Sequence, residues 1–482
     1  MMTRRQALQT VGNGFGMLGL SHLLAAAGGG EPGLLAARQP HFSPRAKHVI
    51  YLFLNGGPSQ VDTFDPKPML TKFDGKSVPA DFGGDDKLKK EVSNARLLGS
   101  PFTFARYGQS GLEVSDLFPH VGKVIDDVCV IRSMHTDLPA HPQAITQMSS
   151  GRLIAGYPSL GSWITYGLGT ENQNLPGFIA MCPGLPNVGP ELWSSGFLPA
   201  AFQGTYVPGG ESEPEKMVRN LTNKRVGLAD QRRQLDLVNA LNRMDLDRHG
   251  ADSLLEGRIQ SLETAYRMQA EALDAFDVSK ETRAMRERYA IPDARPETAT
   301  KLRSATRDGD FARSCLVARR LVERGVRVVQ VYFGEDIPWD SHHDILVHRK
   351  LARQADQPIA ALLADMKASG LLQETLVVIG GEFGRTPSVE TTGRINVQNG
   401  RNHNSRGFTY LLAGGGVKGG LAHGATDDFG FAAVEKPVHL HDLHATILHL
   451  MGLDHTRLTY RYSGRDFRLT DTAGNVVKDI LA

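Results

Sequence analysis

Cysteine is scarce in this sequence, since its 482 residues include only Cys129, Cys182 and Cys315. An exported scaffold held together by disulfides needs more cysteines, in an even number, so this class of protein is excluded. Cys129 lies in the apolar run Val128–Ile131, and Cys315 lies on the apolar face of a helical pattern. Both positions are typical of small buried side chains, so we predict that these two cysteines belong to the core.

Net charge and long apolar runs are also missing. The chain has 54 Lys and Arg residues against 52 Asp and Glu residues, a formal net charge of +2. A general nucleic-acid-binding protein shows a basic stripe, so nucleic acid is not expected as a partner. No apolar run of about 20 residues occurs beyond the N-terminal segment, so we expect no transmembrane span in the mature chain. With 41% hydrophobic and 22% charged residues, the composition indicates a globular fold.

Glycine, by contrast, is abundant, with 52 residues, about 11% of the chain against a typical ~7%. Excess glycine in a globular protein indicates tight turns and close approaches of the backbone. Part of the excess lies in the N-terminal segment, from Gly12 to Gly30. Much of the remainder directly follows predicted strands, at Gly56, Gly57, Gly380, Gly381, Gly384 and Gly414–Gly416. We predict that these glycines line the carboxyl edge of one sheet.

Residues 1–37 are predicted to be an export signal and a linker. Arg4 and Arg5 form a charged start, a weakly apolar stretch runs from Ala7 to Leu24, and Ala25–Ala27 offers small residues for cleavage. The paired arginines indicate the twin-arginine route, so a periplasmic or extracellular location is expected. That route carries folded proteins, often with a metal or cofactor already bound, which favours a metal site. The alternative for this segment is an amphipathic N-terminal helix.

Five short apolar runs, most of them rich in Val and Ile, predict buried strands at Val49–Leu54, Val128–Ile131, Val326–Phe333, Leu376–Ile379 and Phe408–Leu412. Helical patterns lie between some of these runs. The pattern from Phe311 to Val322 stops at Gly325, and the pattern from Ile359 to Met366 stops at Gly370. Helix followed by strand, repeated along the chain, predicts an α/β sandwich with a mainly parallel sheet.

The stretch 220–290 differs from the rest because it is rich in charge, almost free of glycine and without proline. Leu255, Ile259, Leu262 and Tyr266 recur at helical spacing and mark one face. We interpret the stretch as two or three amphipathic helices inserted in, or packed on, the α/β core. A separate coiled-coil arm is the alternative.

Polar residues directly after the predicted strands are the candidates for chemistry, because α/β sheets bind ligands at the carboxyl ends of their strands. Asn55 follows the first strand, together with two glycines that form either a close approach to a ligand or a plain turn. Ser133 and Thr136 follow the second strand, ahead of a helical run. Their hydroxyl groups suit either a nucleophile near helix N–H groups or simple helix caps.

The third and fourth strands are followed by metal-binding and charged residues. Asp340, His342 and His343 lie on one loop, which indicates a metal cluster, or else a chance surface cluster. Glu382 suits a metal ligand or a general base, and Arg385 suits an anionic substrate group. The alternative for these two residues is a structural Glu–Arg pair.

Two further groups of histidines precede or follow the last predicted strand. His403 lies just before it and could complete a metal site with Asp340 and His342. The segment from His439 to His444 is also rich in histidine, but there Asp442 is better interpreted as the N-cap of a helix whose leucines pack on the core.

Taken in order, these motifs resemble one bacterial family, known as domain of unknown function 1501. The motifs are Asn-Gly-Gly-Pro-Ser, Arg-Ser-Met-His, Trp-Asp-Ser-His, Glu-Phe-Gly-Arg-Thr-Pro, Gly-Arg-Asn-His and Asp-Leu-His-Ala-Thr-Ile, with further similarity at 265–269, 277–281 and 318–326. The resemblance implies membership of the alkaline phosphatase and sulfatase superfamily. It therefore implies a single domain over about 45–475, built as a three-layer α/β sandwich with an inserted helical segment.

The resemblance also implies a metal site. One metal would be held by Asp340, by His342 or His343, and by His403. The places of a second metal hold Asn55, Glu382 and Phe383, and because Asn lacks charge and Phe cannot ligate, these departures put a second metal in question.

The nucleophile that the resemblance implies is a hydroxyl group early in the chain. Ser133 and Thr136 are in about the right region for it. The Cys-x-Pro-x-Arg signature of sulfatases is absent, because Cys182 and Pro183 are not followed by the rest of it, so a formylglycine sulfatase is not expected.

The leading hypothesis is an exported, metal-dependent hydrolase of phosphate or sulfate esters, acting on a small molecule or a polysaccharide. The ion would be divalent, and zinc, calcium and magnesium remain open. In this hypothesis Arg385 stabilises charge on the transferring group and Glu382 is a ligand or base. One alternative is a binding or surface-associated protein that has kept the fold and lost catalysis. Another is a different reaction at the same residues. The oligomeric state is open.

Overall fold

The computed structural model describes residues 33–79, 82–83, 86–93, 95–209, 211, 213–218, 226–250, 252–293, 308–390 and 399–482. The predicted export signal lies outside the described residues, apart from the end of its linker at 33–37. Among the helices that are described, none combines the length and the apolar character needed to span a membrane.

A nine-stranded sheet forms the centre of the described chain. Its order is β12 (Leu421–His423), β4 (Val128–His135), β11 (Phe408–Ala413), β8 (Thr375–Gly380), β1 (His48–Phe53), β7 (Val328–Tyr332), β5 (Phe178–Cys182) and β6 (Thr205–Pro208), with β15 (Val438–His439) paired to β4. Strand β11 runs antiparallel to β4 and β8, and the other pairs are parallel. All five predicted strands are present, and the prediction of a mainly parallel sheet is confirmed.

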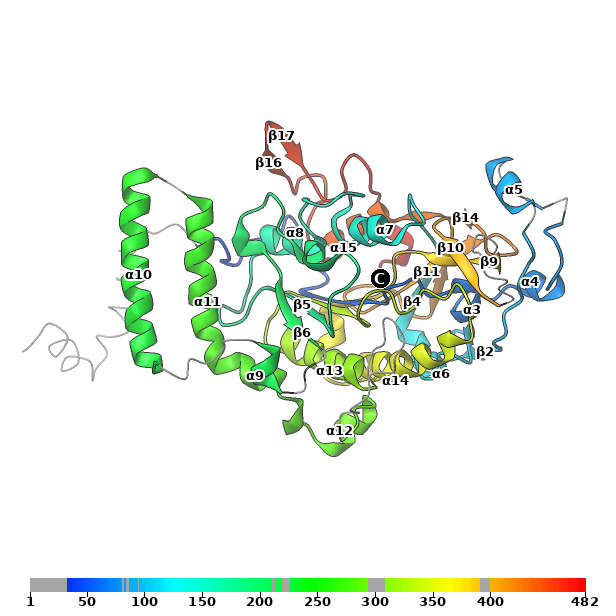
Figure 1. Cartoon of the computed structure of the whole chain (residues 1–482), viewed down its shortest axis with the longest axis horizontal. Helices are drawn as coiled ribbons and strands as arrows, with labels where there is room; N and C mark the ends of the chain where they lie inside the picture. The colour runs from blue at the N-terminus through cyan, green and yellow to red at the C-terminus, as the bar shows by residue number, and fades with distance from the viewer. Residues whose placement is uncertain are drawn as a thin grey trace, which may run out of the picture.

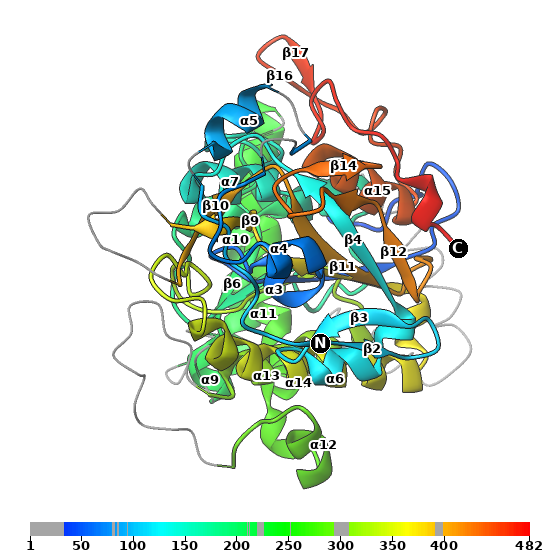
Figure 2. The same cartoon turned by 90° about the vertical axis from the view of Figure 1, so that its right-hand side faces the viewer.

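Helices cover both faces of this sheet (Figure 1, and Figure 2 from the side). One layer holds α6 (Pro119–Lys123), α13 (Asp310–Glu323) and α14 (Val347–Ala368), and the other holds α7 (His141–Ser150), α8 (Leu160–Leu168) and α15 (Leu440–Leu450). Residues of β1 alternate between two apolar clusters, with Ile50 and Leu52 in one and Val49 and Tyr51 in the other. The predicted three-layer sandwich is therefore confirmed.

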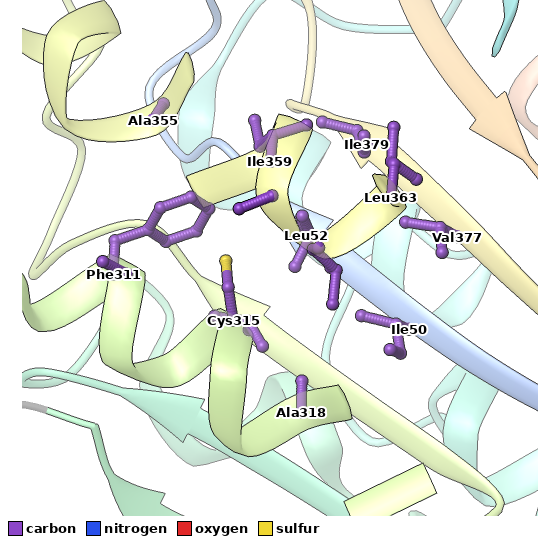
Figure 3. Packing of buried hydrophobic residues seen from close by; sticks show 14 of the residues in the cluster. Ile50, Leu52, Phe311, Cys315, Ala318, Ala355, Ile359, Leu363, Val377 and Ile379 are labelled. Atoms are coloured by element: carbon purple, nitrogen blue, oxygen red, sulfur yellow. The ribbon is translucent and has the colours of Figure 1, made fainter. Parts of the chain in front are cut away.

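The cluster under α13 and α14 shows how the sequence pattern builds a layer. Figure 3 shows Ile50 and Leu52 of β1 facing Cys315 of α13 and Ile359 of α14, and all four side chains are buried. Truncating Ile50, Leu52 or Ile359 to alanine costs about 2–5 kcal/mol. Cys129 and Cys315 are free and buried, so their predicted place in the core is confirmed. Burial raises the pKa of the Cys129 thiol to about 12.

Long helices occupy the stretch predicted to be helical. They are α10 (Leu228–His249) and α11 (Ser253–Phe276), followed by the short α12 (Arg283–Arg288). The predicted apolar face of α11 is wrong in part, because Leu262 is exposed while Gly257 and Met268 are buried. The helix faces the body with Gly257, whose missing side chain lets it approach Ala200. The domain limits themselves stay a prediction.

Other elements of the described chain are short: α3 (Gln60–Thr63), α4 (Pro68–Lys72), α5 (Asp86–Val92), β2 (Phe104–Tyr107), β3 (Leu112–Ser115), α9 (Pro214–Met217), β9 (Gly384–Val389), β10 (Arg401–Asn404), β13 (Ala425–Thr426), β14 (Ala433–Glu435), β16 (Tyr460–Tyr462) and β17 (Arg465–Phe467). Strands β8, β1 and β7 are neighbours and run parallel, so the loops that follow them leave the sheet at one edge. Strands β9 and β10 pair with each other beside that edge, with His403 opposite Arg385.

The start of α15 differs from its prediction. The N-cap is His439, whose side chain accepts a hydrogen bond from His441 N, and Asp442 lies three residues later. The Asp442 carboxylate reaches back to accept the N–H of His439 at 3.0 Å. The helix therefore begins earlier than Asp442, because this reciprocal pair satisfies its first N–H groups.

Buried His444 should make stability depend on pH. Burial lowers the pKa of His444 to about 3, and its Nε2 lies 2.8 Å from the carbonyl oxygen of Met148. The unfolded chain, with a histidine pKa of about 6.5, binds the extra proton first, so stability falls as pH drops below that value. From pH 7 to pH 5 the loss is about 2 kcal/mol in the free energy of unfolding. Denaturant titrations of wild type and His444→Gln at both pH values measure it, and equal losses in the two proteins would contradict it.

Candidate metal centre

Four side chains from three parts of the chain converge at the carboxyl edge of the sheet. Asp340 and His342 lie on the loop after β7, His403 lies on β10, and His141 is the first residue of α7. One ligand atom from each of the four lies within 4.8 Å of the other three. We call this set the His3Asp cluster. Because imidazole nitrogens and a carboxylate oxygen are metal-ligand atoms, this cluster can hold a metal ion.

The cluster is centred on one oxygen atom, Oδ1 of Asp340. This oxygen lies 3.2 Å from His141 Nε2, 3.0 Å from His342 Nε2 and 3.2 Å from His403 Nε2. The Nε2 atoms of His342 and His403 are 2.8 Å apart. Ligand atoms around a tetrahedral zinc ion, with bonds of about 2.0–2.1 Å, lie about 3.3 Å from each other. The separations in the cluster are close to that value.

The other ring nitrogen of each histidine has an acceptor. His141 Nδ1 lies 2.6 Å from Glu382 Oε1, and His342 Nδ1 lies 2.8 Å from Glu390 Oε2. His403 Nδ1 lies 2.7 Å from the carbonyl oxygen of Pro139. A carbonyl or a carboxylate only accepts, so each Nδ1 carries a proton. With a metal ion bound, each Nε2 would offer its lone pair to the ion; without one, an Nε2 that carries a second proton donates it to Asp340. Metal-binding histidines in proteins are oriented in this way.

Negative charge from carboxylates is in excess around the cluster when no cation is bound. Burial raises the pKa of Asp340, but hydrogen bonds from the three histidines and the nearby Arg385 outweigh it and hold the pKa well below its usual range. Burial lowers the pKa of His141, but hydrogen bonds to Asp340 and Glu382 outweigh it and raise the pKa to about 9. In the absence of a metal, a proton on His141 would therefore offset part of the carboxylate charge. A metal ion would displace that proton.

Solvent reaches the cluster from one side. The side chains of His342 and Asp340 are 28% and 20% exposed. His141 lies deeper, and its buried Nε2 has the ion-pair contact with Asp340 Oδ1 at 3.2 Å but no hydrogen bond of good geometry. Such a buried nitrogen costs free energy unless something binds it, and a metal ion would do so.

Glu382 and Arg385 support the cluster from inside the protein. Glu382 is fully buried and accepts the N–H of Gly56 at 2.9 Å as well as the Nδ1–H of His141. Arg385 is also fully buried, and its Nη2 donates to Asp340 Oδ1 at 2.6 Å. Its guanidinium group also donates to the carbonyl oxygens of Gly56 and Gly57. Each of these charged residues therefore orients one residue of the cluster.

Two glycines let the backbone come close enough to build this site. Gly56 has φ +109°, and a Cβ there would lie 2.6 Å from Trp339 N and 2.7 Å from Asp340 N. A Cβ on Gly400 would lie 1.6 Å from the carbonyl oxygen of His342. Glycine is therefore required where the loops carrying the ligands pack together.

Four other predicted site residues are not brought into the cluster. Ser133 Oγ donates to the carbonyl oxygen of Lys436 at 2.7 Å, and Thr136 Oγ1 donates to Gln147 at 2.8 Å. Asn55 is buried, and its amide donates to the carbonyl oxygens of Gly334 and Asp336. His343 is exposed and lies outside the cluster.

Helix capping does not explain Ser133 and Thr136 either. Strand β4 extends to His135 because it pairs with β11 and β15, so Ser133 lies inside a strand. Helix α7 begins after Ala140 and has no side-chain cap. The predicted strand was therefore too short, and the hydroxyl groups lie before the helix start.

His141 is the residue of the cluster that sequence reasoning missed as a ligand. His141 comes after strand β4, a few residues beyond Ser133 and Thr136. It stands at the first turn of helix α7, next to Pro142. A histidine at that place, at the edge where Asp340 was expected, is the signal that could have found it. Phe383, which takes the place of a second-metal ligand in the resemblance, packs its ring 4.8 Å from His141 and 4.6 Å from His403, between ring centroids.

The sequence model of the family described as "Protein of unknown function (DUF1501)" matches residues 46–481, so the chain belongs to this family. No curated protein matches the chain.

Among solved structures the likeness is weak. A protein in the alkaline phosphatase superfamily from Vibrio parahaemolyticus is 10% identical with a TM-score of 0.37, over 92% of this chain and 76% of that one. The PsFucS1 sulfatase from Pseudoalteromonas sp. is 13% identical with a TM-score of 0.33, over 91% and 70%. The phosphonate monoester hydrolase SpPMH from Silicibacter pomeroyi is 13% identical with a TM-score of 0.31, over 70% and 68%. At such TM-scores the likeness carries no inference about chemistry.

Removing one histidine of the cluster should remove the metal. We expect the folded wild-type protein to hold about one equivalent of metal, and His403→Ala to hold little, because three remaining ligand groups bind more weakly. His343→Ala is the matched control, since that histidine is exposed and outside the cluster, and it should keep the metal. Elemental analysis of the three purified proteins decides this. Equal metal content in wild type and His403→Ala would contradict the site.

The buried carboxylate behind His141 should also matter. Glu382→Gln keeps the shape and removes the charge that accepts the Nδ1–H of His141, so metal affinity should fall about 10–100-fold. Competition with a chelator of known affinity measures the change. Glu374→Gln, at a surface ion pair with Lys47, is the control and should leave the affinity unchanged.

Proposed function

We propose that this chain is an exported, metal-dependent hydrolase of phosphate or sulfate esters. The observation that carries the proposal is the orientation of three imidazoles, each held at Nδ1 by an acceptor and each turning Nε2 to Asp340 Oδ1. Export rests on the twin-arginine motif at Arg4 and Arg5. The substrate would be a small molecule or a polysaccharide that carries an anionic ester.

The ligand chemistry favours zinc, or a similar transition metal, over calcium or magnesium. Three imidazole nitrogens and one carboxylate oxygen suit zinc. Calcium and magnesium prefer sites made of oxygen ligands. The protein would hold the ion through His141, Asp340, His342 and His403.

When bound, such an ion polarises an ester oxygen and lowers the pKa of water. The residues of the chain would position it, with Arg385 fixing Asp340 and Glu382 fixing His141. Because Arg385 is fully buried, we assign it to positioning and not to contact with the transferring group.

The attacking group is better supplied by water than by the protein. The hydroxyl groups of Ser133 and Thr136 are engaged elsewhere, with Lys436 O and Gln147, among the residues that the structure describes. Water can approach from the exposed side of His342 and Asp340. Four protein ligands complete a tetrahedral zinc site, so catalysis needs a further ligand position on that side.

The alternative is a protein that binds a metal or an anionic ligand and has lost catalysis. Two observations favour it. The ring of buried Phe383 lies against His141 and His403, and the amide of Asn55 is engaged with backbone carbonyls. Neither residue could then help to hold a second metal ion.

One experiment separates these functions. The zinc-loaded protein is assayed with aryl phosphate, phosphodiester and aryl sulfate substrates, before and after chelation and after zinc is returned. We expect turnover that chelation abolishes and zinc restores, and that His403→Ala loses at least about 100-fold while His343→Ala does not. Bound metal without turnover of any substrate would support the alternative. A protein that binds no metal would overturn both.

A further inference from the structure

The helix α10 lies at the end of the molecule, separated from the α/β body by α11 (Figure 1). Its inner face contacts α11 through several polar groups. Arg232 donates to both carboxylate oxygens of Glu263, at 2.9 Å and 2.8 Å, and Asn239 donates to the same carboxylate. Gln269 donates to Gln231 at 2.7 Å. Surface helices normally turn most of their apolar side chains to the protein, so these polar contacts on the inner face of α10 are unusual.

Large apolar side chains of α10 lie on the opposite, outer face, in addition to Leu235 and Leu246, which are half-buried on the side of Asn239. Leu237, Leu241 and Met244 follow one another at helical spacing, and they are 63%, 56% and 51% exposed. Val238 beside them is also exposed. Three large apolar side chains in one row on an exposed helix indicate an interaction surface. We call this row, with its flanking charges, the outer stripe.

The charges at the two ends of the outer stripe have a regular arrangement around Asn239. Asp230 and Arg248 lie nine positions before and after it, and Arg233 and Asp245 lie six positions before and after it. Leu237 and Leu241 lie two positions before and after the same residue. Rotating the helix by 180° about Asn239 therefore brings acid opposite base and leucine opposite leucine.

We propose that the outer stripe binds the outer stripe of a second copy of this chain, antiparallel, with the two-fold axis at the height of Asn239 and between Leu237 and Leu241. In this pairing Leu237 of one copy faces Leu241 of the other, and Asp230 faces Arg248 at both ends. A two-fold axis requires such self-complementarity, because every contact occurs twice. The charges of α10 complement the charges of the same helix in the reversed direction. Binding to a partner of another kind would not require this pattern.

The proposed dimer leaves the His3Asp cluster accessible. Figure 1 places α10 at one end of the long axis, while β9 and β10, which carry Arg385 and His403, lie toward the other end. Helix α10 spans 22 residues, about 33 Å. The α10 helices of the two copies would therefore contact each other along a substantial length. The dimer does not rest on the proposed hydrolase activity.

The first test is the mass of the full chain in solution, measured by sedimentation equilibrium over a range of concentrations. We expect wild type to dimerise and the double variant Leu237→Glu, Leu241→Glu to be monomeric. Arg243→Glu is the control on the same helix, because it is exposed and lies about 120° around the helix from Leu237. It should dimerise like wild type. Circular dichroism of each variant checks that the helices are retained.

The second test concerns the antiparallel register. Asp230→Arg alone and Arg248→Asp alone should each weaken the dimer at least tenfold, because like charges then meet at both ends. Mixing the two single variants in equal amounts, or combining both changes in one chain, should restore association. A monomeric wild type, or a dimer that the leucine variants leave intact, would overturn the proposal. Loss of the dimer without rescue by mixing would overturn the antiparallel pairing.

Discussion

The site depends on how one half-buried carboxylate oxygen is held. Asp340 Oδ1 is contacted by three imidazole nitrogens and by the guanidinium group of Arg385, at 2.6–3.2 Å. A carboxylate removed from water is costly unless it is paired, so this oxygen requires either protons or a metal ion on the surrounding nitrogens. Because Asp340 attracts each histidine, and each histidine is anchored at its far nitrogen, the cluster has one geometry. The parallel strands β1, β7 and β8 supply the edge at which this arrangement becomes possible.

That geometry narrows the chemistry. Among the described residues one cluster, the His3Asp cluster, could hold a metal ion. Phe383 and Asn55, which stand at the second-metal places that the resemblance implies, are packed against histidine rings and bonded to backbone carbonyls. The buried guanidinium group of Arg385 forms an ion pair with Asp340. Catalysis at such a centre would depend on water and on the exposed side of the cluster, and less on a protein nucleophile or on a guanidinium clamp.

Much of the fold was predictable, because apolar periodicity and glycine stops are local signals. The runs at Val49–Leu54 and Leu376–Ile379 became neighbouring strands, and the pattern from Phe311 to Val322 became α13. The site was predictable where its residues lie on the loop after a strand, as at Asp340 and His342, or lie in a compact motif, as at His403. His141 was missed because its relation to Asp340 depends on strand pairing across the sheet. Glu390 was missed for the same reason, since its partner His342 lies on another loop.

The order of apolar and polar residues along the chain is enough to predict the layered α/β architecture, the burial of Cys129 and Cys315, and metal-binding residue types at one sheet edge. Which of those residues meet follows from the folded chain alone. It brought in His141, left out Asn55 and His343, turned Arg385 inward and placed the leucines of α10 on an exposed face. The physical reason is that contacts between distant segments are set by packing of the whole core, and a sequence pattern describes only the face that each segment buries.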